Sequence, residues 1–238
     1  GDINASINSV AQGPNGEIYI LGSFEDASGE ANADYVALWN GSRWVGLGQS
    51  ISGDGVFSCT DNCDFFDIAI SPTGDVFIAG SFDVAGLVNQ QSLMKWDGSS
   101  WTSVISDADA VIYQMLFTAE GDLYVSGEFQ NLADIAEADN VAKWNGSSWS
   151  ALGSDGSGNG ALNNWAYAMA FGSDNSLYVS GSFSDAGGTS SADYLARWDG
   201  TTWSAVGTAS IDGQEFLPYA YSLLVDSSTG RDVLYAGG

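Results

Sequence analysis

The sequence contains no histidine and only five basic residues, against 30 acidic residues in a chain of 238. Without histidine, Ser-His-Asp and Cys-His catalytic schemes are excluded within this chain. The formal net charge of −25 argues against nucleic acid and anionic membrane surfaces as partners, because both are bound through Lys and Arg. Cations, basic proteins and neutral glycans are the partners that this charge leaves open, and its simplest role is to keep the protein soluble.

Long apolar runs and prolines are also scarce. No stretch approaches the roughly 18 apolar residues of a membrane helix, so membrane insertion is not expected. Three prolines beside 31 glycines suggest many tight turns, and a hydrophobic fraction of 45% is enough for a large core.

Only two cysteines are present, Cys59 and Cys63, separated by three residues. We predict a local disulfide, which would indicate an oxidising compartment. A metal site is the alternative, and it is weaker because two thiols without histidine or a second thiol pair seldom complete a zinc shell.

Two sequence phrases recur along the chain. The first is an aromatic strand that ends in glycine and phenylalanine, and the second is a Trp-Asn/Asp-Gly-x-x-Trp hairpin, which contains every tryptophan except Trp165. Asn-Gly and Asp-Gly turns between aromatic strands need positive φ, so we expect it at the four turn glycines. The strands are 19–24, 77–82, 124–129 and 178–183, with a partial copy at 235–238; the hairpins are 38–44, 95–101, 143–149 and 197–203, with turn glycines Gly41, Gly98, Gly146 and Gly200.

Each unit of about 50 residues reads as four antiparallel strands, named A to D in chain order, which is the signature of a β-propeller blade. Strand A alternates bulky and small residues, as in Tyr167-Ala168-Met169-Ala170, so blades could stack bulky face on small face. The predicted fold is all-β, with four complete blades and the first half of a fifth. The blades cover about residues 7–50, 65–106, 111–154 and 165–208, and the partial blade covers 219–238, within one propeller over 1–238.

These motifs resemble the kelch-like propeller repeats of large secreted and cell-surface proteins, of the type Tyr-Val-Gly-Gly-x-Phe followed by Ala-x-Trp-Asp-Gly-x-x-Trp. The resemblance covers nearly the whole chain, although Gly-Ser or Gly-Glu replaces the Gly-Gly doublet except at Gly237-Gly238. It implies a propeller fold and an extracellular or cell-surface location, and it carries no catalytic residues. The fifth unit lacks strands C and D, so we expect a fragment of a longer propeller, or a ring completed by another chain.

Most of the acidic residues fall in the loops that join strand D to strand A and strand B to strand C, which open on one face of a propeller. Calcium is the only cofactor indicated. Asp155 and Asn159 lie in a Gly-rich segment resembling half of a calcium loop, and Asp61, Asp64 and Asp67 form a second candidate. The alternative for the first segment is a flexible Gly/Ser connector.

Aromatic residues that break the repeat lie in or beside the D-to-A loops. We interpret them as ligand-binding candidates for a protein or glycan, because Trp and Tyr favour interfaces. The alternative is that such residues fill gaps between blades. The candidates are Phe65, Trp165, Phe216 and Tyr219.

No catalytic residue is identified. The sequence therefore favours a non-enzymatic, extracellular or cell-surface propeller that acts as a binding or structural scaffold through its acidic loop face. One alternative is a carbohydrate-active enzyme domain with paired carboxylates on that face. The other is a subunit of an extracellular assembly, joined by strand pairing at the open C-terminal edge.

Overall fold

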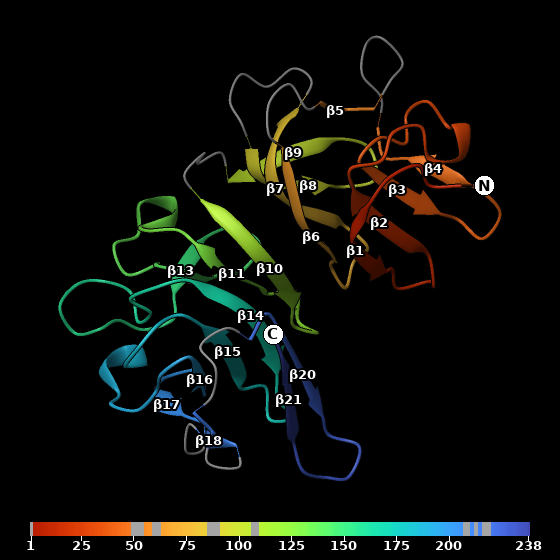
Figure 1. The fold of residues 1–238 in the computed structure, drawn as a ribbon. Coiled ribbons are helices and arrows are strands. Elements are labelled where there is room, and N and C mark those ends of the chain that lie inside the picture. Colours follow the sequence, from red (N-terminus) through yellow and green to blue (C-terminus); the bar gives the residue numbers. More distant parts are fainter. Residues whose placement is uncertain are drawn as a thin grey trace. The chain divides into compact units, whose positions relative to one another are not determined.

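The computed structural model divides into two compact units, Gly1–Gly121 and Asp122–Gly238 (Figure 1). Both are built from antiparallel sheets, and in the part of the chain that the structure describes helix is limited to three short 3-10 turns. The residues that the structure describes are 2–48, 55–58, 63–84, 91–105, 110–206, 210–211, 214–215 and 220–238.

The first unit contains two sheets in which consecutive strands pair. The first has the order β1-β2-β3-β4. The second pairs β6, β7, β8 and β9 in turn and adds the two-residue strand β5 beside the end of β7. The bounds are β1 Ile7–Gln12, β2 Ile18–Gly22, β3 Val36–Trp39, β4 Trp44–Gly46, β5 Phe57–Ser58, β6 Asp64–Ile70, β7 Val76–Val84, β8 Gln91–Trp96 and β9 Trp101–Ile105.

Two further sheets have the orders β10-β11-β12-β13 and β14-β15-β16-β17, and a two-stranded sheet pairs β20 with β21. Four sheets of four sequential antiparallel strands, followed by a half sheet, confirm the predicted propeller blades. The bounds are β10 Val111–Phe117, β11 Leu123–Glu128, β12 Val141–Trp144, β13 Trp149–Ala151, β14 Ala166–Phe171, β15 Leu177–Gly181, β16 Leu195–Trp198, β17 Trp203–Ala205, β18 Ser210–Ile211, β19 Gln214–Glu215, β20 Ser222–Asp226 and β21 Val233–Gly237.

The turns between strands C and D are alike in all four blades. Their glycines have positive φ as predicted, at 93°, 93°, 94° and 98° for Gly41, Gly98, Gly146 and Gly200. The Asn or Asp before each glycine accepts hydrogen bonds from the backbone N–H groups two and three residues later, which closes the turn.

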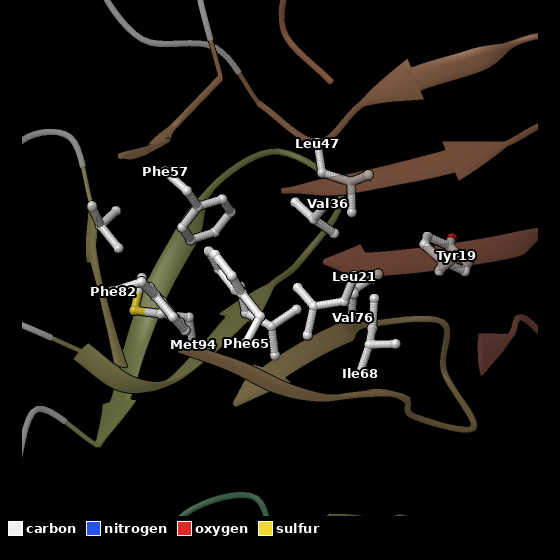
Figure 2. Packing of buried hydrophobic residues seen from close by; sticks show 12 residues of the cluster. Tyr19, Leu21, Val36, Leu47, Phe57, Phe65, Ile68, Val76, Phe82 and Met94 are labelled. Atoms are coloured by element: carbon white, nitrogen blue, oxygen red, sulfur yellow. The ribbon is translucent and has the colours of Figure 1, made fainter. Parts of the chain in front are cut away.

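Strand A lies beside strand A of the next blade within each unit, and a bulky face packs on a small one. In the first unit, the small Ala11 of β1 packs against the buried cluster that contains Ile68 of β6. Tyr19, Leu21 and Val76 belong to the same cluster (Figure 2). In the second unit, β14 presents Ala168 and Ala170, which pack with Leu223 of β20. Bulky side chains on small ones let neighbouring sheets approach closely without voids.

The second tryptophan of a hairpin fastens a blade to the blade before it. The indole N–H of Trp101 donates to the carbonyl oxygen of Leu47 at 2.6 Å, and Trp203 donates to Leu152 at the same distance. Leu47 and Leu152 directly follow the D strands of the preceding blades, so this bond explains the second tryptophan of these two hairpins. Among the described residues no helix is long and apolar enough to cross a membrane.

Candidate functional site

Three of the B-to-C loops share one bent conformation. Each contains a 3-10 turn preceded by a non-glycine residue in the left-handed region, namely Asp26 (φ 50°), Asn131 (φ 52°) and Asp185 (φ 49°). The first residue of each turn is buried, which anchors the loop to its blade. Left-handed backbone at non-glycine residues persists only where surrounding contacts hold it. The turns are η1 Ala27–Gly29, η2 Leu132–Asp134 and η3 Ala186–Gly188.

An aspartate closes each of these loops. Its Oδ1 atom accepts a hydrogen bond from the backbone N–H of the left-handed residue. The pairs are Asp34 with Asp26 at 2.7 Å, Asp139 with Asn131 at 2.7 Å and Asp193 with Asp185 at 2.8 Å.

Two of these aspartates also hold a D-to-A loop. The Oδ2 atom of Asp34 accepts from the N–H of Gly55 at 3.1 Å, and that of Asp139 accepts from Gly160 at 2.9 Å. Both carboxylate oxygens are then engaged, so these acids position the loops. Sequence analysis missed this role, although an Ala-Asp pair just before strand C marks it in three blades.

Asp67 connects three inner strands of the first unit. Its carboxylate accepts from the Ser9 hydroxyl of β1 at 2.8 Å, from its own neighbour Ile68 N–H at 2.9 Å and from the Met115 N–H of β10 at 2.7 Å. Burial raises the pKa of Asp67 to about 6, and these three hydrogen bonds oppose the rise. Asp67, predicted as a metal ligand, therefore has a structural role in this arrangement.

The other residues of that metal prediction do not gather around Asp67. Asp64 is exposed at the start of β6, and Asp61 lies outside the described residues. Among the residues that the structure describes, no three acids or cysteines form a group that could hold a metal ion. Calcium at this loop stays a prediction.

The segment around Asp155 forms a closed turn. Oδ1 of Asp155 accepts from the Ser157 N–H at 2.7 Å, and Oδ2 accepts from the side-chain amide of Asn159 at 2.9 Å. These bonds lower the pKa of Asp155, the Asn159 amide having the largest effect. Each carboxylate oxygen of Asp155 thus accepts a hydrogen bond within the turn, and calcium at this segment stays a prediction.

The repeat-breaking aromatics of the first unit lie in the core. Phe65 is 3% exposed and stacks on Phe82, with ring centroids 5.3 Å apart, and Phe57 is 4% exposed beside the same ring (Figure 2). Phe65 also stacks on Tyr35 of the preceding blade, with centroids 5.1 Å apart. Phe65 therefore fills a gap between two blades and is not at the surface for a ligand. Cys63 is half-buried against this cluster; its predicted disulfide partner Cys59 lies outside the described residues.

The second unit leaves a row of aromatic rings at the surface. Trp165 is 41% exposed and packs edge-on against Tyr167, with centroids 6.5 Å apart. Tyr167 in turn contacts Tyr221 at 5.0 Å, and Tyr221 is 62% exposed. We call Trp165, Tyr167 and Tyr221 the aromatic row. It spans the starts of the neighbouring inner strands β14 and β20, where the D-to-A loops end.

Only Trp165 of this row was predicted as a ligand-binding residue. Tyr167 follows the alternation of strand A, and Tyr221 precedes a strand whose repeat is weak, so neither stands out in the sequence. The predicted neighbours Phe216 and Tyr219 lie outside the described residues.

On the side of the A-to-B turns, the basic residues of three blades pair with acids. Lys95 contacts Asp75 at 2.8 Å and Lys143 contacts Asp122 at 2.6 Å; Arg197 pairs with Asp174 in the same way. Lys95 also lies over the ring of Phe77, 5.8 Å from its centroid, and Lys143 lies 5.5 Å from that of Tyr124. These bases hold the outer sheet surface together through charge and cation–π contacts.

An open hollow of about 330 Å³ lies among the A-to-B turns of the first unit. Backbone and uncharged side chains form its wall. Its residues are Gln12, Gly13, Pro14, Ile70, Ser71, Pro72, Phe117, Thr118 and Ala119.

Among comparisons with known proteins, only the comparison with solved structures finds similar proteins. No family model matches the sequence, and no curated protein matches it. A catalytically inactive virginiamycin B lyase from Staphylococcus aureus, crystallised with quinupristin, is 10% identical with a TM-score of 0.43; the match covers 85% of this chain and 56% of that one. YCF48 bound to a D1 peptide is 15% identical with a TM-score of 0.43, covering 85% of this chain and 54% of that one.

The extracellular domain of a proposed hybrid two-component system from B. thetaiotaomicron is 10% identical with a TM-score of 0.34, covering 94% of this chain and 38% of that one. The chain thus spans little more than half the length of the first structures it matches. The kelch-like resemblance stays a prediction.

Proposed function

We propose that these blades are a non-catalytic binding scaffold of an extracellular or cell-surface protein. The ligand, a protein or a glycan, binds where the D-to-A and B-to-C loops meet the ends of the inner strands. The observation that carries this proposal is the aromatic row, in which Trp165 and Tyr221 are 41% and 62% exposed on neighbouring strands. Tyr and Trp are enriched at protein interfaces because they offer a large, rigid contact area with a polar tip.

Rigid support of the row favours this proposal. Asn163 and Ser184 exchange two hydrogen bonds of 3.0 Å, which join the D-to-A loop before Trp165 to the B-to-C loop of the same blade. The N–H of Trp165 donates to Asn164 at 2.9 Å, and the Tyr167 hydroxyl lies 3.4 Å from that of Ser182. A binding surface whose side chains are held in place loses less conformational entropy on association.

Arrays of extracellular proteins and of glycans test this function. We expect specific ligands for the wild-type protein and at least a tenfold loss of affinity in the Trp165→Ala/Tyr221→Ala double variant. Tyr235→Ala is the matched control, because Tyr235 is 55% exposed and pairs with Leu224, on the other face of the β20–β21 sheet.

Binding that is equal in the double variant and the control would place the ligand elsewhere, the hollow at Pro14 and Pro72 being the first alternative. Release of shortened products from any bound glycan would instead indicate a carbohydrate-active enzyme.

A further inference from the structure

We infer that the aromatic row binds a cationic protein segment, whose Arg or Lys side chains lie against the rings of Trp165, Tyr167 and Tyr221. This inference rests on the proposed function and names the ligand class of the same surface. Three properties of the second unit support it: its charge, the chemistry of its rings, and the use of the polar groups beside them.

The second unit is strongly acidic. Between Asp122 and Gly238 the sequence has 14 acids and three bases. Lys143 and Arg197 are ion-paired with acids at the A-to-B turns. The third base, Arg231, lies in the turn between β20 and β21, at the other end of β20 from Tyr221. A surface potential of this sign attracts cationic partners and speeds their encounter.

One exposed carboxylate lies on a loop that is joined to the loop before Trp165. Asp185 is exposed, and it follows Ser184, which is hydrogen-bonded to Asn163 two residues before Trp165. Its backbone N–H, not its carboxylate, is engaged by the loop-closing Asp193. An Arg or Lys side chain lying on the rings therefore has a carboxylate on a neighbouring loop to pair with.

Aromatic faces attract cations through the negative potential over the ring. The chain itself uses this contact, since Lys95 lies over Phe77 and Lys143 over Tyr124. Exposed Trp and Tyr rings on a strongly acidic unit are suited to the same contact with a partner's cation.

The polar side chains beside the row are partly engaged within the protein. Both the amide oxygen and the amide nitrogen of Asn163 bond to Ser184, and the oxygen of Asn164 accepts from Trp165. A sugar bound on the rings would need such groups for its hydroxyls, because polar groups fix the orientation of a ligand on an apolar surface. A cation on the ring faces needs none of them, and this difference favours a cationic segment over a neutral glycan.

Titration calorimetry with two matched peptides tests the inference. One is an unstructured 12-residue peptide of alternating arginine and serine; the other replaces each arginine with citrulline, which keeps the planar shape and removes the charge. We expect the arginine peptide to bind and the citrulline peptide not to bind. Trp165→Ala and Tyr221→Ala should each raise Kd about three- to tenfold. Tyr221→Phe, which keeps the ring, and Tyr235→Ala should bind like the wild type.

Two controls separate this inference from its alternatives. Arginine-peptide binding that is absent, or that is the same in wild type and Trp165→Ala and disappears with added salt, overturns it and indicates only surface charge. Maltohexaose and cellohexaose serve as neutral glycan probes. Oligosaccharide binding that Trp165→Ala weakens, without a comparable effect on the arginine peptide, overturns the cationic ligand and leaves the proposed binding function standing.

Discussion

An aromatic residue that breaks the repeat lies at or just before the start of both β6 and β14, but it is buried in one case and exposed in the other. In the first unit, the repeat-breaking Phe65 is 3% exposed in the core between two blades. In the second unit, the repeat-breaking Trp165 is 41% exposed on its surface. Phe65 directly precedes the bulge in β6, and Trp165 lies one position further from the bulge in β14. Both residues are aromatic, so their chemistry alone does not decide their burial.

The burial differs because the two aromatic residues lie one position apart in the strand pairing. Phe65 pairs with Gly80, and the equivalent pair in the second unit is Ala166 with Gly181. Ala166 is buried like Phe65, whereas Trp165 corresponds to Asp64, which is exposed. Because successive strand residues point to opposite faces, a shift by one position moves an aromatic ring from the core to the surface.

The largest expected effect tests this register. Phe65→Ala should lower the free energy of unfolding by about 3 to 5 kcal/mol, because it leaves a cavity beside Phe82 in a packed core. Trp165→Ala should lower it less, by about 1 kcal/mol, because 41% of the residue is already exposed to water and its removal leaves no closed cavity. Urea unfolding of both variants measures the difference. Equal losses would mean that Trp165 is part of the core and not of a binding surface.

A second difference between these strands lies two residues further on. Asp67 of β6 bonds to β1 and β10, while the equivalent residue of β14 is Ala168. Asp67→Ala should cost about 1 to 3 kcal/mol at neutral pH, because the N–H of Met115 loses its acceptor in a buried place. Ala168→Gly, a small change at the matched position, should cost about 1 kcal/mol or less.

The pH dependence sharpens the same prediction. The pKa of Asp67 is raised to about 6, so the folded protein binds this proton more tightly than the unfolded chain does. The stabilisation that comes from this bound proton is therefore complete below pH 4 and is lost as the pH rises through 6. Relative to Asp67→Asn, the wild type should gain stability from pH 7 to pH 4. A constant difference over this range would mean that Asp67 has an ordinary pKa.

The repeated elements could be predicted because each carries its own local signal. An Asn-Gly or Asp-Gly pair determines the backbone conformation of a hairpin turn from residues that are adjacent in the sequence. Positive φ at Gly41 and Gly146 was therefore predictable. The loop contacts were not, because they join residues far apart in the sequence. The sequence alone does not show that Asp34 holds a D-to-A loop, because the N–H that donates to it belongs to Gly55, 21 residues later.

The candidate site was predictable only in part for the same reason. Trp165 stands out because it lies outside the hairpin phrase, whereas Tyr167 and Tyr221 come together only when β14 and β20 pack side by side. Phe65 was misassigned because exposure depends on register, and the bulge between Phe65 and Asp67 is not visible in the sequence.

The smallest expected effect compares the C-to-D turns of different blades. Blades one and three use Asn40 and Asn145 at the first turn position, and blade two uses Asp97 for the same hydrogen bonds. The Ser100 N–H and then the hydroxyl and N–H of Ser99 lower the pKa of Asp97 to about 2. Because this value is below the ordinary 3.8, the stabilisation is present above pH 4 and is lost as the pH falls through 2.

An asparagine provides the same acceptor without the charge. Asp97→Asn should therefore leave the melting temperature nearly unchanged at pH 7, and its small deficit relative to wild type should disappear by pH 2. Asp97→Ala, which removes the acceptor altogether, should melt at a lower temperature than Asp97→Asn at both pH values. Thermal unfolding of the three proteins at pH 7, 4 and 2 measures this. If the alanine and asparagine variants melted together, the side-chain hydrogen bonds would contribute nothing, and the Asn and Asp turns would be alike only because glycine follows both.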